Sequence, residues 1–187
     1  MNRCFVLSIA LVAGLLCTSS AAQAEGMGIR IGADGAFVLP VSSWSDVAGI
    51  GLGVMARGEY ALQPALHLTG RLGYIYNLSK DQAGVGSTGT SELPFLVGAK
   101  YYFSGEQGGL YGAAELGLVS ITSRADVDIM GYSTSASASE TKLGFTAGAG
   151  FEVGGLDLRG QLFIPSVGDA GDFLGIMATV GYTFVEL

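Results

Sequence analysis

The C-terminal segment 173–187 has two alternating faces, and this alternation limits what the chain can fold into. The apolar face consists of Leu174, Ile176, Ala178, Val180, Tyr182 and Phe184, and the other face of Gly175, Met177, Thr179, Gly181 and Thr183. Alternation with a period of two residues predicts a β-strand. The apolar face ends in two aromatic residues, as a strand does when it faces lipid and ends at a membrane interface.

The N-terminal residues have the features of a secretory signal. A charged start at Arg3 precedes an apolar run at residues 5–16, which is too short to span a bilayer. Ala22-Gln23-Ala24 is a small-x-small cleavage site. We therefore predict a signal peptide at residues 1–24 and a single mature domain at residues 25–187. The alternative is lipid attachment at Cys17, which the large Leu16 before it disfavours.

The composition excludes several functional classes. Cys4 and Cys17 both lie in the predicted signal peptide, so the mature chain can form neither a disulfide nor a thiolate site. The single histidine, His67, excludes a multi-histidine metal site. The net charge of −7 argues against a nucleic-acid partner, which attracts basic surfaces. We expect no cofactor and no metal ion.

The alternating pattern recurs along the mature chain and predicts eight strands. Their ranges are 28–39, 50–62, 66–78, 94–103, 110–122, 143–153, 156–164 and 173–184. Such lengths suit strands that cross a bilayer at a tilt, whereas strands in soluble proteins are commonly about five or six residues long. The predicted fold class is all-β, an eight-stranded antiparallel up-and-down transmembrane β-barrel.

The predicted connections alternate in length. Short turns lie at residues 63–65, 104–109 and 154–155, and long, mostly polar or small loops lie at 40–49, 79–93, 123–142 and 165–172. Short turns on one rim and long loops on the other are typical of outer-membrane barrels. An even number of strands places both termini on the short-turn side, which is the periplasmic side.

Aromatic residues on the predicted outer faces form two girdles. The long-loop girdle contains Tyr74, Tyr76, Phe95 and Phe145, and the short-turn girdle contains Tyr60, Tyr101, Phe103, Phe151, Tyr182 and Phe184. A soluble sandwich has no reason to sort aromatic residues by depth, so the girdles favour a membrane barrel.

The predicted inner faces carry five cationic and five anionic residues. They are Arg30, Asp34, Arg57, Glu59, Arg71, Lys100, Glu115, Glu152, Asp157 and Arg159. A balanced set lets each charge find a partner. One interpretation is a selectivity filter or proton path. The other is a structural plug, because an eight-stranded barrel has an interior just wide enough for side chains to fill.

The inner faces nearer the long loops are apolar. The candidate pocket consists of Val38, Ile75, Leu96, Val119, Ile121, Phe163, Phe173 and Met177, with Gly51, Gly53 and Gly144 beside it. It suits a lipid tail or another hydrophobic molecule. The alternative is that these residues pack against each other, since no convergent polar group marks a site.

With these patterns, residues 25–187 resemble the small outer-membrane β-barrel superfamily, which includes the OmpA membrane domain, OmpX and related surface proteins. The resemblance rests on the strands, on the ending Gly181-Tyr182-Thr183-Phe184 and on turn phrases such as Tyr60-Ala61-Leu62-Gln63-Pro64. It implies location in the outer membrane of a Gram-negative bacterium, contact with outer-membrane lipids and lipopolysaccharide, and the barrel-assembly machinery as a partner during biogenesis. A monomer is expected.

Some small outer-membrane barrels are lipid hydrolases or acyltransferases, which need a nucleophile and a base facing the membrane. His67 is predicted to lie inside the barrel beside a periplasmic turn, with no nearby serine, so we expect no enzyme. For Asp126 and Asp128 in the longest loop, a solvated surface is preferred to a calcium site. Trp44 is interpreted as an interface anchor or, alternatively, as a contact for a partner.

The expected function is structural or surface-interactive, in envelope integrity, adhesion or host contact through the loops. The alternative is a small channel or a binding protein for a hydrophobic molecule in the outer half of the lumen. The register also predicts that Val54→Arg on the outer face costs about 2–4 kcal/mol and that Gly53→Ser on the inner face costs far less.

Overall fold

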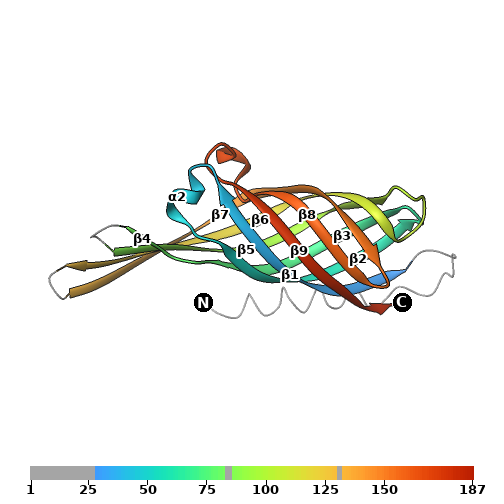
Figure 1. Ribbon diagram of the computed structural model, residues 1–187, viewed down its shortest axis with the longest axis horizontal. Coiled ribbons are helices and arrows are strands. Elements are labelled where there is room, and N and C mark those ends of the chain that lie inside the picture. Colours follow the sequence, from blue (N-terminus) through green and yellow to red (C-terminus); the bar gives the residue numbers. More distant parts are fainter. Residues whose placement is uncertain (1–27, 83–85, 130–131) are drawn as a thin grey trace, which may run out of the picture.

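The fold consists of strands that each pair antiparallel with the next strand along the chain. The computed structural model describes residues 28–82, 86–129 and 132–187, and Figure 1 shows their arrangement. The barrel strands are β1 (Ile29–Val41), β2 (Gly51–Gln63), β3 (Leu66–Asn77), β5 (Gly86–Tyr102), β6 (Gly109–Ile129), β7 (Tyr132–Val153), β8 (Leu156–Ile164) and β9 (Leu174–Glu186). Short elements on the long-loop side are α2 (Trp44–Val47), β4 (Lys80–Gln82) and the 3-10 helix η1 (Val167–Asp169).

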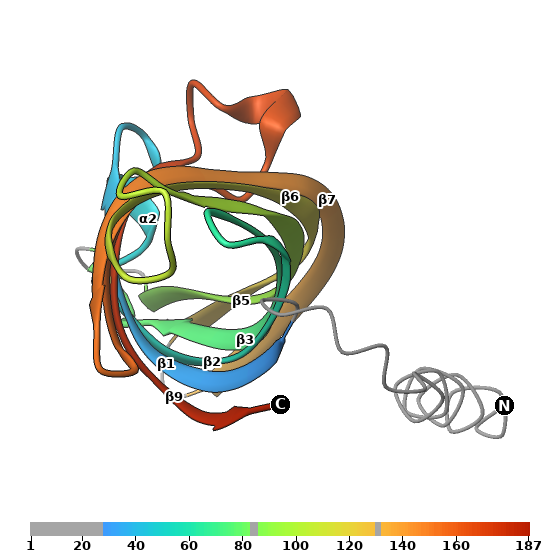
Figure 2. The same cartoon turned by 90° about the vertical axis from the view of Figure 1, so that its right-hand side faces the viewer.

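The pairing closes on itself, because β1 pairs with β9 and β3 pairs with β5. Viewed from the short-turn end, the strands surround one lumen (Figure 2). The predicted eight-stranded antiparallel up-and-down barrel is therefore confirmed. The predicted signal peptide, residues 1–24, lies outside the described residues. Among the helices in the described ranges, none is long and apolar enough to cross a membrane.

The strands alternate strictly between lumen and exterior. In β1 and β9, buried and exposed residues follow one another along most of each strand. Val54 is 70% exposed, and its neighbour Met55 is 1% exposed. The aromatic residues of both predicted girdles are exposed, except that Phe145 is half-buried. Apolar side chains that point outward are unfavourable in water but favourable in lipid, so this outer surface is typical of a barrel wall in a membrane.

Three strands continue well beyond the predicted barrel. The predicted loops 79–93 and 123–142 are wrong in large part, because β5, β6 and β7 extend through them. Ladder pairs such as Ser87 with Asp126 and Thr122 with Ser139 join these extensions into a sheet. The sheet projects past the long-loop rim, at the left in Figure 1. Outside the bilayer a strand needs no apolar face, so the period that predicted the other strands is absent there.

One inward glycine contradicts the predicted tolerance of the lumen. A Cβ atom on Gly53 would lie 2.5 Å from the Tyr74 carbonyl oxygen and 2.8 Å from Cγ1 of Ile75. The first of these atoms belongs to the backbone and cannot move aside cheaply. The expectation that Gly53→Ser costs little is therefore wrong, because Ile75 already fills the space over this glycine.

Candidate functional site: a lumen with a charged half and an apolar half

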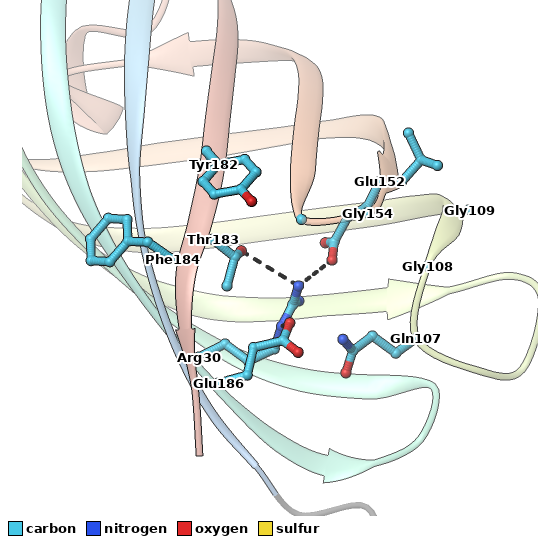
Figure 3. A pocket seen from close by; sticks show the side chains of 12 residues that line it. Arg30, Gln107, Gly108, Gly109, Glu152, Gly154, Tyr182, Thr183, Phe184 and Glu186 are labelled. Atoms are coloured by element: carbon cyan, nitrogen blue, oxygen red, sulfur yellow. Dashed lines mark hydrogen bonds and ion pairs between the residues drawn. The ribbon is translucent and has the colours of Figure 1, made fainter.

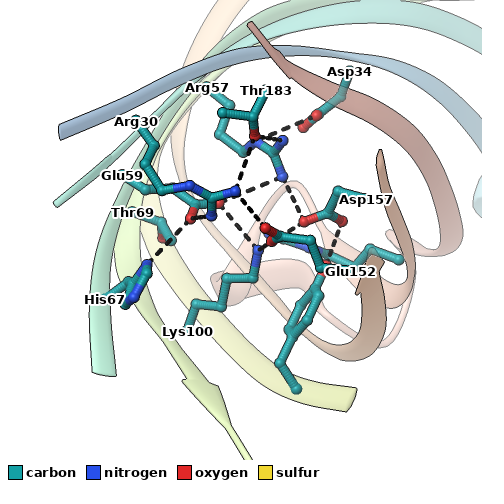
Figure 4. Close-up of polar contacts among 12 residues, drawn as sticks. Arg30, Asp34, Arg57, Glu59, His67, Thr69, Lys100, Glu152, Asp157 and Thr183 are labelled. Atoms are coloured by element: carbon teal, nitrogen blue, oxygen red, sulfur yellow. Dashed lines mark hydrogen bonds and ion pairs between the residues drawn. The ribbon is translucent and has the colours of Figure 1, made fainter. Parts of the chain in front are cut away.

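The short-turn half of the lumen contains all ten charged residues of the predicted inner set. Each of them is at most 4% exposed. Lys100 lies at the centre (Figure 4). Its Nζ is 3.2 Å from Oε1 of Glu59, 2.5 Å from Oε2 of Glu152 and 2.7 Å from Oδ2 of Asp157. One ammonium group on β5 thus joins carboxylates from β2, β7 and β8.

Two arginines extend this cluster toward β1 and β2. Arg30 contacts Glu152 and lies 3.0 Å from Oε2 of Glu59. Arg57 places Nη1 2.5 Å from Oδ2 of Asp157 and 3.4 Å from Oε1 of Glu59. Each carboxylate therefore meets more than one cation. This satisfies the requirement that buried charges be both paired and hydrogen-bonded.

A second group of charges lies deeper in the barrel, around Glu115. Nη1 of Arg71 is 3.2 Å from Oε2 of Glu115, and Nη1 of Arg159 is 3.0 Å from Oε1. The hydroxyls of Thr69 and Thr146 donate to the same carboxylate, at 3.0 and 3.1 Å. Nη2 of Arg71 also lies 3.2 Å from Oδ2 of Asp34, and Asp34 reaches Arg57. The two groups thus form one continuous network across the lumen.

Acidic groups that converge in this way could hold a metal ion. Ligand atoms of Glu59, Glu152 and Asp157 lie within 4.8 Å of one another. The Lys100 ammonium contacts all three, so the position between them is taken by the protein's own cation.

The long-loop half of the lumen is filled by apolar side chains. The structure brings together all eight residues of the predicted apolar set. Val38, Ile75, Leu96, Val119, Phe163 and Met177 are fully buried, and Ile121 and Phe173 are partly buried against them. They belong to one packed cluster that also contains Ala36, Ala48, Met55 and Trp44.

Trp44 closes the apolar half from the long-loop side. Both predicted roles for it, interface anchor and partner contact, are wrong, because it is 2% exposed. Its ring centroid lies 6.1 Å from that of Phe163 and 6.3 Å from that of Phe173. The error arose because the segment before β2 was treated as an open loop, whereas it folds inward as α2.

Backbone and side-chain hydrogen bonds hold this cover in place. The Trp44 amide donates to the Asp172 carbonyl at 2.9 Å, and the Ser42 hydroxyl donates to the Gly171 carbonyl at 2.7 Å. On the opposite side, Lys80 and Thr88 donate to carbonyls of the α2 segment. Two long connections and the β4–β5 hairpin therefore hold α2 over the lumen.

The comparisons with known proteins agree with this architecture. A family model described as the outer membrane protein beta-barrel domain matches residues 8–184. The chain belongs to this family. It is therefore a protein of the Gram-negative outer membrane. A search of curated protein sequences gives no match.

Solved structures that resemble this outer-membrane barrel include Ail, the attachment invasion locus protein of Yersinia pestis. Identity is 15% and the TM-score 0.58, over 88% of this chain and 100% of Ail. Ail in complex with the heparin analogue sucrose octasulfate gives 14% and 0.55, over 88% and 100%. Ail in a phospholipid bilayer nanodisc gives 13% and 0.51, over 86% and 100%. At such identities the similarity shows the fold alone.

Several lumen residues of the barrel were not predicted. Tyr111 donates to Oδ1 of Asp157 and accepts from Nε of Arg159 at 3.1 Å, and Tyr102 donates to Oε2 of Glu152 at 2.7 Å. Both tyrosines face inward next to the short-turn girdle. Their positions in the alternating pattern of β5 and β6 could have predicted this. Glu186 lies beyond the predicted end of the last strand, and its Oε1 is 2.9 Å from Nε of Arg30.

One buried carboxylate lies in the apolar half. Glu92 is fully buried, and both of its oxygens accept from Nδ2 of Asn77, at 2.7 and 2.8 Å. Nδ2 of Asn77 also contacts the Thr90 hydroxyl at 2.9 Å. No ion pair to Glu92 is found among the described residues. Glu92 was missed because its segment was predicted to be a loop.

His67 is fully buried beside the charged half. Its Nδ1 lies 3.4 Å from Oε2 of Glu59, and its ring meets the Tyr102 ring edge-on, with centroids 5.0 Å apart. These contacts hold the imidazole within the network rather than beside a nucleophile.

A cavity of about 680 Å³ lies at the short-turn end (Figure 3). Arg30 and Glu152 face it from the network, and Gln107, Thr183 and Glu186 line its sides. The cavity reaches the charged half of the lumen, and the packed charges lie between it and the apolar half.

Proposed function

We propose that this outer-membrane barrel is a structural and surface-contact protein with a closed lumen, acting in envelope integrity or adhesion. The observation that carries the proposal is the sheet that β5, β6 and β7 build beyond the long-loop rim (Figure 1). Strands of this length exceed what crossing a bilayer requires. The extra length therefore serves something outside the membrane.

The lumen supports a closed barrel. The charged network occupies one half, and the packed cluster beneath Trp44 occupies the other. A hydrophobic ligand in the apolar half would have to displace Trp44 and its hydrogen-bonded cover. The contacts of His67 with Glu59 and Tyr102 support a non-catalytic role. We propose a monomer in the membrane, surrounded by lipid and lipopolysaccharide and assembled by the barrel-assembly machinery.

The charges at the long-loop end bear on the kind of partner. Apart from the buried Glu92, the segments at the long-loop end contain seven acidic and three basic residues. The acidic residues are Asp46, Asp81, Asp126, Asp128, Glu140, Asp169 and Asp172, and the basic ones are Lys80, Arg124 and Lys142. Ail has been solved with a sulfated sugar analogue. An acidic surface repels such polyanions, so we propose that this protein does not share that ligand.

Shortening the projecting hairpin tests the surface role. Ser123 pairs with Ala138, so residues 124–137 can be replaced by an Asn-Gly turn without disturbing the barrel. We expect the variant to keep the heat-dependent gel shift of a folded barrel and to lose adhesion of expressing bacteria to host-cell and matrix surfaces. Full-length protein provides the reference. Unchanged adhesion by the shortened protein would contradict the proposal.

A further inference from the structure

The projecting sheet ends at β7 on one side and at the three-residue strand β4 on the other, so β7 provides its long edge. β7 pairs with β6 along its whole length, from Tyr132 to Glu152, but pairs with β8 only from Phe145 onward. Lys142 is approached by the η1 connection, where its Nζ lies 3.8 Å from Oδ2 of Asp169. The edge from Tyr132 to Thr141 therefore has no strand beside it among the described residues.

This edge has few of the features that usually protect a sheet edge. Natural edges are blunted by proline, by a β-bulge, by charged side chains, lysine above all, or by a covering segment, and Glu140 is the one charged residue of this edge. The register of β6 and β7 runs without a shift, and the segment 132–141 contains no proline and no lysine. Residues 136–141 are all exposed. The edge can therefore accept another strand through backbone hydrogen bonds.

The sequence of the edge matches itself in reverse. Ser135-Ala136-Ser137-Ala138-Ser139 reads the same in both directions. In an antiparallel pair centred on Ser137, serine stands opposite serine and alanine opposite alanine. Thr134 stands opposite Glu140, so no like charges meet across the pair. From position 135 to position 139 every residue is serine or alanine, so no large side chain stands in the centre of the pair.

We propose that the partner of this edge is a second copy of the chain in a facing membrane, paired antiparallel through β7. The inference rests on the proposed surface role. β7 runs from the tip of the projection toward its own membrane, so two copies in one membrane have parallel β7 strands. Copies in opposed membranes have antiparallel ones. The pairing thus joins two cells and leaves the barrel monomeric within each membrane.

The acidic long-loop end adds a salt dependence to this contact. Two such ends repel at low ionic strength, and salt screens exposed charges over roughly 8–10 Å at physiological concentrations. Contact between copies therefore strengthens as salt rises from low to physiological levels. Binding of a basic foreign strand to the same edge would instead weaken as salt rises.

Charge placed on the edge tests the pairing directly. One variant carries Ser135→Lys with Ser139→Lys, and a second carries Ser135→Glu with Ser139→Glu. Position 135 of one copy faces position 139 of the other, so each variant repels itself and the two attract each other. The full-length proteins are expressed at matched levels in bacteria with short lipopolysaccharide, each population with its own fluorescent label. The heat-dependent gel shift shows that each variant is folded.

We expect bacteria with the unmodified protein to aggregate, and at least tenfold less aggregation for either variant alone. Mixing the two variants should restore aggregates that contain both labels. Three results would overturn the inference: no aggregation by the unmodified protein, aggregation of either variant alone, or no rescue on mixing. Adhesion to host surfaces that still requires residues 124–137, without self-aggregation, would overturn this inference alone and leave the proposed function standing.

Discussion

The short-turn half of the lumen contains five cations and five anions, whereas the long-loop half contains a packed apolar cluster beneath Trp44. The charges of the first half are connected through shared partners, because Lys100 contacts three carboxylates that Arg30 and Arg57 also contact. In the apolar cluster of the second half, the loss of one side chain leaves a space but no uncompensated charge. The two halves of the lumen should therefore respond differently to substitution.

Removing the central cation should have the largest effect. Lys100→Met keeps much of the side-chain length and leaves Glu59, Glu152 and Asp157 close together without their shared ammonium. Breaking a buried charge set by removing one partner costs about 3–5 kcal/mol. The free energy of unfolding can be followed by the fluorescence of Trp44, the one tryptophan of the chain. Lys142→Met is the control, because Lys142 pairs at the surface and should lose under about 1 kcal/mol. Equal losses would mean that the buried network contributes no more than a surface pair.

A charged side chain on the outer wall tests whether charged residues are accommodated only inside the lumen. Val54→Arg places a guanidinium on the lipid side of β2, opposite Tyr74, and such a change costs about 2–4 kcal/mol at mid-membrane and less toward the interface. Val54→Leu at the same position should be nearly neutral. Unfolding in lipid vesicles measures both. A cheap arginine here would show that Val54 does not face lipid, and that the in–out register of β2 is incorrect.

Two substitutions that preserve size give the finest test of the difference between the halves. Arg71 reaches both Asp34 and Glu115, and lysine has a single nitrogen to offer them. Arg71→Lys should therefore cost about 1.5–3 kcal/mol, the contribution of one hydrogen bond to a charged group. Met177→Leu in the apolar half should cost under about 1.5 kcal/mol. Unfolding of both variants in the same lipid measures the two losses of stability. A larger loss for Met177→Leu than for Arg71→Lys would contradict the proposed difference between the two halves.

The sequence was sufficient for the barrel wall and for the charges inside it. Lipid outside and a narrow lumen inside impose a period of two on every membrane-crossing strand. The position of a residue such as Arg57 in this alternation therefore predicts whether its side chain points into the lumen or toward lipid. The parity of Lys100 and Glu152 placed them inside in the same way. The sequence does not predict which carboxylate pairs with which cation, because the pairing depends on the stagger of the strands around the closed barrel.

Prediction failed where the membrane stops imposing that period. The extensions of β5, β6 and β7 lie beyond the membrane and are mostly polar or small, without a continuous apolar face, so they were predicted to be loops. Trp44 was misplaced for a related reason, because a four-residue helix that folds over a lumen leaves no periodic signal. The inward position of Glu92 was missed for the first of these reasons, because its segment was predicted to be a loop and a loop has no regular inner face.

The ionic conductance of the unmodified protein in a planar bilayer tests the closed lumen most directly. Paired charges fill one half and packed apolar side chains fill the other. We therefore expect no steady current above that of the protein-free bilayer, at either polarity. Large and stable conductance from the unmodified, folded protein would contradict the closed lumen and make a channel the leading function.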